Sequence, residues 1–134
     1  MITPLNHAMI TGVLDAHGFA HRADDDGDVF GNWQGTLIYF FRIGADREML
    51  QVRALTTRVF AIDDVPRLYA FCNAWNHDRL FPKAYVHVAD DGAARVVGEV
   101  TADWEHGVSV PQLDQVMMCG IATGVQLAEA VTEL

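Results

Sequence analysis

Four polar side chains in the second half of the chain have the types and the spacing needed to hold a small polar ligand. Tyr85 and His87 alternate with apolar residues in one segment, and Arg95 and Glu99 do so in the next, with an Asp-Asp-Gly turn at 90–92 between them. In a β-hairpin, alternate residues of both strands project from one face, so these four side chains would share it. Ordinary cross-strand pairing on a solvated face is the competing interpretation, and the pattern favours it.

The acidic segment Asp24–Asp28 is a second candidate for chemistry, because carboxylates bind calcium. If Gly27 takes the glycine position of a calcium loop, Arg22 occupies the first ligand position and Trp33 the position of the bidentate glutamate. Neither residue can supply a carboxylate oxygen. We therefore interpret the segment as a solvated turn of a hairpin and predict that it does not bind calcium tightly.

The histidines and cysteines do not have the spacing of a metal or catalytic site. The six histidines form no HExxH motif and the two cysteines form no CxxC motif, so we predict no metal and no cofactor. Cys72 lies on the apolar stripe of a predicted helix, which favours core packing over a reactive thiolate. Cys72 and Cys119 fit reduced thiols better than a bridge. No nucleophile, base and orienting group can be placed together, so the sequence predicts a protein that is not an enzyme.

Composition limits the classes of partner. The chain has 134 residues with 18 acidic and 9 basic side chains, a formal net charge of −9, which repels phosphate backbones and argues against nucleic acid. No basic region precedes an apolar run, and no stretch approaches the roughly 20 apolar residues that cross a membrane. We expect a cytoplasmic protein with a single domain over residues 1–134, whose one core needs no metal or disulfide.

Hydrophobic periodicity predicts an α+β fold of order α-β-β-β-α-β-β-α, with the helices packed on one face of a mostly antiparallel sheet. Thr3 and Pro4 are the expected start of the first helix, and Ser109 with Gln112 forms a capping-box spacing before the last. The expected elements are a helix at 4–17, strands at 19–22, 29–33, 36–43 and 49–60, a helix from 63 or 64 to about 81, strands at 83–88 and 95–100, and a helix at 110–132.

The second helix should pack its apolar stripe on the sheet. Asn76 falls on the apolar side of this helix, where its amide needs partners, and we predict that it ties the helix end to the following strand, with ligand contact as the alternative. The predicted core residues are Leu5, Met9, Val13, Leu37, Val52, Leu68, Cys72, Trp75, Val86, Val100 and Leu113.

Two motifs resemble the YbjN family of bacterial proteins. One is Leu-Tyr-Ala-Phe-Cys-Asn-Ala-Trp-Asn at 68–76, which leads to Phe-Pro-Lys-Ala-Tyr-Val at 81–86. The other is Gly-Val-Ser-Val-Pro-Gln-Leu at 107–113, and the resemblance extends over most of the chain. It implies a fold like that of type III secretion chaperones, commonly dimeric, and a role as a sensory transduction regulator with no catalytic residues to carry over. The long acidic turn at 24–28 departs from the family pattern.

The last helix is apolar over more of its circumference than one sheet requires, which predicts a homodimer. Gly120, Gly124 and Ala128 recur at every fourth position, a spacing that allows close approach of a backbone, either the chain's own sheet or a second chain. The predicted interface residues are Val116, Met118, Gly120, Ala122, Gly124 and Leu127.

Two functional hypotheses follow. The favoured one is a non-enzymatic protein-interaction or chaperone-like regulatory protein that acts as a homodimer and holds another polypeptide on exposed sheet and helix surface. The alternative is a small-molecule-binding regulatory domain that uses Tyr85, His87, Arg95 and Glu99, which predicts a concave pocket at their hairpin.

Overall fold

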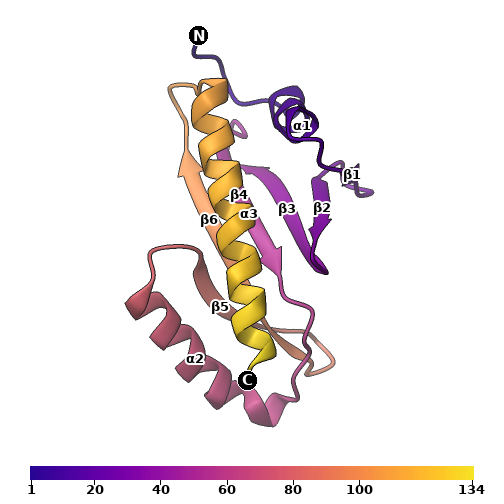
Figure 1. The fold of residues 1–134 in the computed structure, drawn as a ribbon, viewed down its shortest axis with the longest axis vertical. Helices are drawn as coiled ribbons and strands as arrows, with labels where there is room; N and C mark the ends of the chain where they lie inside the picture. Colours follow the sequence, from indigo (N-terminus) through magenta and orange to yellow (C-terminus); the bar gives the residue numbers. More distant parts are fainter.

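A computed structural model describes residues 1–134 as three α-helices and a six-stranded antiparallel sheet (Figure 1). The helices are α1 (His7–Ala16), α2 (Val65–Asp78) and α3 (Val110–Thr132), and a short 3-10 turn, η1 (Ile62–Asp64), precedes α2. The strands are β1 (Arg22–Ala23), β2 (Val29–Trp33), β3 (Thr36–Ile43), β4 (Met49–Leu55), β5 (Lys83–Val88) and β6 (Ala94–Asp103). Their order across the sheet is β1-β2-β3-β4-β6-β5, which places the C-terminal hairpin beside β4.

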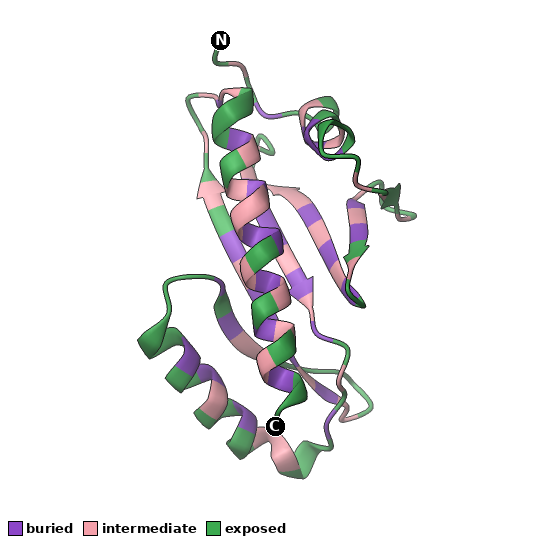
Figure 2. Ribbon diagram, in the orientation of Figure 1, coloured by how far each residue is buried: buried purple, intermediate pink, exposed green.

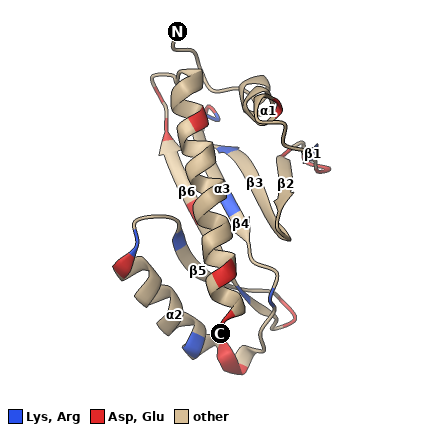
Figure 3. Ribbon diagram, viewed as in Figure 1, with Lys and Arg blue, Asp and Glu red and all other residues tan.

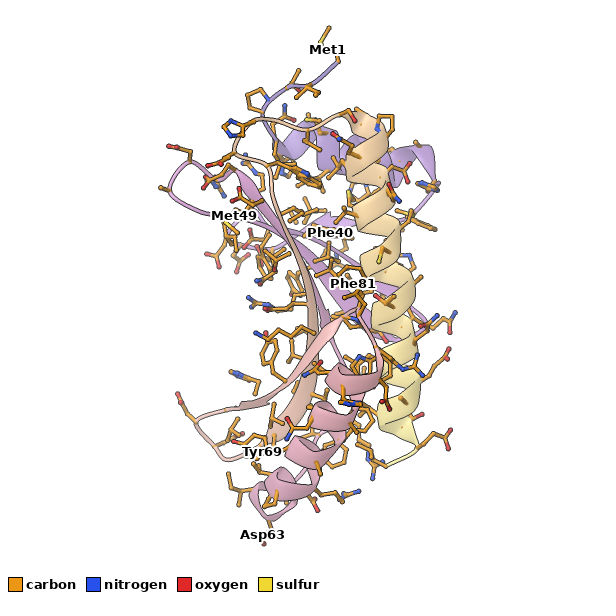
Figure 4. All side chains as sticks on the ribbon, turned by 90° about the vertical axis from the view of Figure 1, so that its left-hand side faces the viewer. Met1, Phe40, Met49, Asp63, Tyr69 and Phe81 are labelled. Carbon is orange, nitrogen blue, oxygen red and sulfur yellow. The ribbon has the colours of Figure 1, made fainter.

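All three helices lie on the same face of the sheet, as the sequence predicted. Figure 4 shows α3 along one side of the sheet, with Phe40 between the two, while Met49 lies on the opposite side. The α+β class is confirmed, and the helices and longer strands follow the predicted order. Of the strand expected at 19–22, the structure has only β1, two residues at Arg22–Ala23. The other face of the sheet carries no helix, and we call it the open face.

Helix α3 approaches the centre of the sheet closely because two of its residues are glycines. A β-carbon added at Gly120 would lie 2.6 Å from Val52 Cγ1, and one added at Gly124 would lie 2.8 Å from Ala54 Cβ. Both glycines therefore pack within the chain against β4. The spacing of Gly120 and Gly124 in the sequence allowed packing either against the chain's own sheet or against a second chain, and the structure shows the first.

The buried apolar residues form two clusters, both of which include residues of α3 (Figure 2). The larger joins α1 and the first half of α3 to β2, β3 and β4, and the smaller joins α2 and the end of α3 to β5 and β6. Most predicted core residues are buried. Met9, Leu37 and Val86 are only partly buried, and Leu37 is so because it lies on the open face.

The predicted start of the first helix is wrong. Helix α1 begins at His7 with Asn6 as its cap, whose side chain accepts a hydrogen bond from the Met9 amide at 2.8 Å. Thr3 instead exchanges backbone hydrogen bonds with Val108 in an isolated bridge, which keeps the chain extended there. The start of α3 is as predicted, because Ser109 and Gln112 form the reciprocal capping box.

The end of α2 is tied to β5 by side chains, which fixes where the C-terminal hairpin lies. Asn76 Nδ2 donates to the Ala84 carbonyl and its Oδ1 accepts from the Ala84 amide, both at 2.8 Å. Trp75 Nε1 donates to the Pro82 carbonyl at 3.0 Å. The predicted structural role of Asn76 is confirmed.

Candidate binding face of the sheet

The open face is built by the alternate strand residues that point away from the helices. A row of stacked aromatic rings crosses it: Tyr39 lies between Phe30 and Phe41, with ring centroids 4.9 and 5.3 Å apart. The Arg53 guanidinium lies 4.7 Å from the centre of the Phe41 ring. The strand register gives the principal residues of the open face as Phe30, Asn32, Leu37, Tyr39, Phe41, Ile43, Met49, Gln51, Arg53, Leu55, Lys83, Tyr85, His87, Arg95, Val97, Glu99 and Thr101.

Charge is segregated between the sheet and the rest of the chain. Five of the nine lysines and arginines lie in strands, compared with two of the eighteen aspartates and glutamates. Figure 3 shows basic positions within the strands, whereas the acidic positions lie largely in turns and helices. The sheet is thus locally basic in a chain whose net charge is −9.

A cleft lies on the open face over β4, β6 and β5. The strand register places Leu55, Val97 and Tyr85 in one row across the three strands. Arg53 lies in the row on one side of it, and Arg95 is paired with His87 in the row on the other side. The hollow has a volume of about 340 Å³ and is lined by Arg53, Leu55, Tyr85, His87, Ala89, Ala93, Arg95 and Val97.

The arginines and the lysine near this cleft form no salt bridge within the chain. Arg53, Lys83 and Arg95 are absent from its salt bridges, although Glu99 lies directly opposite Arg53 and Lys83 in the strand register. Arg53 Nη2 donates to Gln51 Oε1, but the buried Nε of Arg53 has no hydrogen-bond partner. A buried donor without an acceptor is unfavourable to the fold.

Tyr85 supplies a neutral hydroxyl group beside these cations. Burial raises the pKa of its phenol, more than the neighbouring Arg53 lowers it, and the nearby Glu99 carboxylate raises it further. The phenol therefore stays protonated at neutral pH and remains a hydrogen-bond donor.

The structure brings three of the four predicted ligand residues into one cleft. Tyr85, His87 and Arg95 line it, whereas Glu99 lies in the next row and borders a shallower hollow with Lys83. Sequence reasoning missed Arg53. Alternation along a strand at 49–55 places Arg53 on the face opposite Val52, but no local pattern shows that β4 lies beside β6.

The six predicted interface residues of α3 fall into two groups. Gly120, Gly124 and Leu127 are buried in the chain's own core, so they are not available to a second chain. Val116 and Met118 are partly buried against the core, and Ala122 is exposed. An interface on α3 would therefore use the second group.

The acidic turn brings three carboxylates together. Oxygens of Asp24, Asp26 and Asp28 lie within 4.8 Å of one another. Asp24 Oδ1 also accepts the backbone amides of Asp26 and Asp28, at 3.0 and 2.9 Å, which explains the tight turn without a cation. Burial raises the pKa of Asp28, and repulsion from Asp24 and Asp26 raises it further.

The two cysteines are not joined by a disulfide. Burial raises the pKa of the Cys72 thiol to about 11, so at neutral pH it is protonated and a poor nucleophile. No helix combines the length and the apolar character needed to cross a membrane.

These features define an α+β protein in which a six-stranded antiparallel sheet is covered by helices on one face and offers a cationic, aromatic surface on the other. The chain belongs to the YbjN family, described as "Putative bacterial sensory transduction regulator", which matches residues 6–133. The predicted family is thereby confirmed.

Two solved structures show the same fold. The crystal structure of YbjN from E. coli, described as "a putative transcription regulator", is 18% identical with a TM-score of 0.80, over 99% of this chain and 96% of that one. An uncharacterized protein from Methanothermobacter thermautotrophicus is 12% identical with a TM-score of 0.64, over 96% of this chain and 98% of that one. No match is found among proteins of curated function.

Proposed function

We propose that this protein is a non-enzymatic regulator that holds a partner polypeptide on the open face of its sheet. The observation that carries the proposal is that helices cover only one face, which leaves a row of stacked, partly exposed aromatic rings, Phe30, Tyr39 and Phe41, uncovered by any helix. Contiguous apolar surface with a polar rim is typical of interaction sites. The family description as a regulator is consistent with this role.

Charge complementarity indicates what the partner carries. The open face presents three basic residues, Arg53, Lys83 and Arg95, and one acidic residue among them, Glu99, with which none of the three forms a salt bridge. A polypeptide segment with acidic and apolar side chains would complement both the cations and the aromatic row. A basic segment would be repelled.

We also propose that the protein is a homodimer through the outward surface of α3. The helix has no charged side chain between Asp114 and Glu129, although much of that surface is exposed or only partly buried. A helix surface that meets only water normally carries charged residues. Ala122, which is exposed, lies in the middle of this uncharged stretch.

The polypeptide-binding proposal is tested by a matched pair of tyrosine substitutions. Tyr39→Glu places a carboxylate in the aromatic row of the open face, whereas Tyr69→Glu does the same on the exposed surface of α2. Affinity capture from the native host, analysed by mass spectrometry, should give partners that the wild-type protein and Tyr69→Glu retain and that Tyr39→Glu loses. Circular dichroism checks that both variants fold. Equal capture by the two variants would contradict the proposal.

A second function is favoured by one specific observation, the cleft at the hairpin. The small-molecule hypothesis predicts a concave pocket at Tyr85, His87 and Arg95, and the structure has a hollow of about 340 Å³ there. Ligand sites occupy clefts of roughly 300–1,000 Å³, so this volume is sufficient for a small ligand. The two functions are compatible, because the cleft occupies one part of the open face.

A further inference from the structure

We infer that the cleft on β4, β6 and β5 binds a small organic anion, that is, a carboxylate or phosphate group on an apolar or aromatic body. This inference rests on the second proposed function, a small-molecule site in the same cleft, and names the chemistry of its ligand. It is carried by two observations: cations on both sides of an apolar floor, and the absence of any acidic side chain among the lining residues.

The two arginines place positive charge on both sides of the floor. Arg95 has His87 and no carboxylate opposite it, whereas Glu99 lies opposite Arg53 and Lys83. Arg53 lies two rows away from Arg95, so the floor has guanidinium groups on both sides. An anion between the two guanidinium groups would be attracted to both. The chain as a whole carries a net charge of −9, which repels anions. The arginines at the cleft provide a local positive charge that attracts them there.

The Arg53 guanidinium is already held in place to receive a ligand. It lies over the Phe41 ring and donates a hydrogen bond to Gln51, and both contacts restrict its position. Guanidinium groups present several N–H donors in a fixed fork that matches carboxylate and phosphate oxygens. An arginine that is fixed beforehand loses less side-chain entropy on binding.

The apolar floor gives the ligand its second feature. Leu55 and the ring of Tyr85 are partly exposed and form the accessible apolar surface of the cleft. Val97 lies between them but is only 3% exposed, because the surrounding side chains cover it. A ligand with an apolar or planar body would contact Leu55 and Tyr85, whereas a bare inorganic anion would not.

Binding is tested with small probes of known charge on the ¹⁵N-labelled protein at low ionic strength. Phenyl phosphate and benzoate carry an anion on an aromatic ring, benzamide is the neutral counterpart of benzoate, and inorganic phosphate and acetate are anions without the ring. We expect phenyl phosphate and benzoate to shift the amide signals of residues around Leu55, Tyr85, Arg95 and Val97 in a saturable manner. Benzamide, inorganic phosphate and acetate should bind at least tenfold more weakly.

Substitutions locate the site. Arg95→Met keeps much of the side-chain stem and removes the charge, and it should weaken phenyl phosphate binding at least tenfold, because hydrogen bonds between charged groups are stronger than those between neutral groups. Arg53→Met, as a second variant, should do the same. Lys83→Met is the matched control, a cation on the same face that does not line the cleft, and it should change the affinity less than twofold. Thermal unfolding verifies that each variant is folded.

The outcomes separate this inference from the function on which it rests. If benzamide binds the cleft as well as benzoate does, the small-molecule function stands and the anionic class is wrong. If no probe shifts the cleft signals at 10 mM (about the weakest affinity expected of such small ligands), both are wrong. An equal loss of binding in Lys83→Met and Arg95→Met would show a diffuse charge effect and would also overturn the inference.

Discussion

A single carboxylate in the acidic turn lies where its charge is disfavoured. The pKa of Asp28 is raised by burial and by Asp24 and Asp26, against the weaker attraction of Arg47 and Arg42. The folded chain therefore binds this proton more tightly than the unfolded chain does. The ionised form lowers the free energy of unfolding at neutral pH, and this cost disappears as the pH falls through the raised pKa towards 3.8.

Asp28→Asn should accordingly raise the free energy of unfolding at pH 7, and the gain should shrink as the pH approaches the ordinary value of an aspartate. Chemical denaturation followed at several pH values measures this difference. Asp25→Asn is the control, because Asp25 is exposed and lies outside the group of three clustered carboxylates. A loss of stability at pH 7 in Asp28→Asn would mean that the attraction of the two arginines dominates.

At the scale of the element, two helical glycines should respond to the same substitution with opposite signs. Gly12 lies in α1 with nothing within 4 Å of an added β-carbon, so Gly12→Ala should stabilise the protein by roughly 0.5–1 kcal/mol. Gly120→Ala would force a methyl group onto Val52 and should destabilise it by about 1–3 kcal/mol. Denaturation midpoints measure both. Equal stabilisation of the two variants would show that α3 can move away from the sheet without cost.

The junction between α2 and β5 gives a second test. Asn76→Asp removes the donor to the Ala84 carbonyl and places a negative charge beside it, which should cost about 1–3 kcal/mol. Asn73→Asp on the same helix is the control, because the Asn73 side chain is exposed and makes no hydrogen bond within the chain. Its effect should stay within about 0.5 kcal/mol. Similar losses in both variants would point to helix electrostatics instead of the Asn76 bonds.

The elements that could be predicted from the sequence are those whose signals are local. The start of α3 follows from Ser109 and Gln112, which are three residues apart, and the shared face of Tyr85 and Arg95 follows from strand alternation. The start of α1 was predicted wrongly because Thr3 has a distant partner, Val108, that no local pattern reveals.

The candidate site was predicted only in part for the same reason. Its hairpin residues could be identified as a group, since a short turn joins their strands. Arg53 reaches them only because β4 pairs with β6, across the whole of α2 and β5 in the sequence. Similarly, periodicity identified the apolar excess of α3 but could not tell which of its residues the sheet would cover.

At the scale of the whole molecule, the proposed homodimer has a direct test. Light scattering at tens of micromolar protein should give the mass of a dimer, and Ala122→Glu should reduce it to that of a monomer while the circular dichroism spectrum stays helical. Tyr39→Glu, on the opposite side of the molecule, should leave the dimer intact. A monomer mass for the wild-type protein would rule out the dimer. If Tyr39→Glu dissociated the dimer and Ala122→Glu did not, the dimer interface would lie on the open face.

The two edges of the sheet restrict how this protein can assemble. An edge strand with free backbone groups invites another strand to pair with it, the route by which many sheet proteins aggregate. One edge here is β1, which has only two residues, and at the other the Asn76 amide occupies both backbone groups of Ala84 on β5. Neither edge offers a long free ladder. Pairing of strands between chains at the sheet edges is therefore unfavourable, and chains can associate only through the faces of the sheet or through the helices. The protein should consequently not aggregate at high concentration, even though no helix covers one face of its sheet.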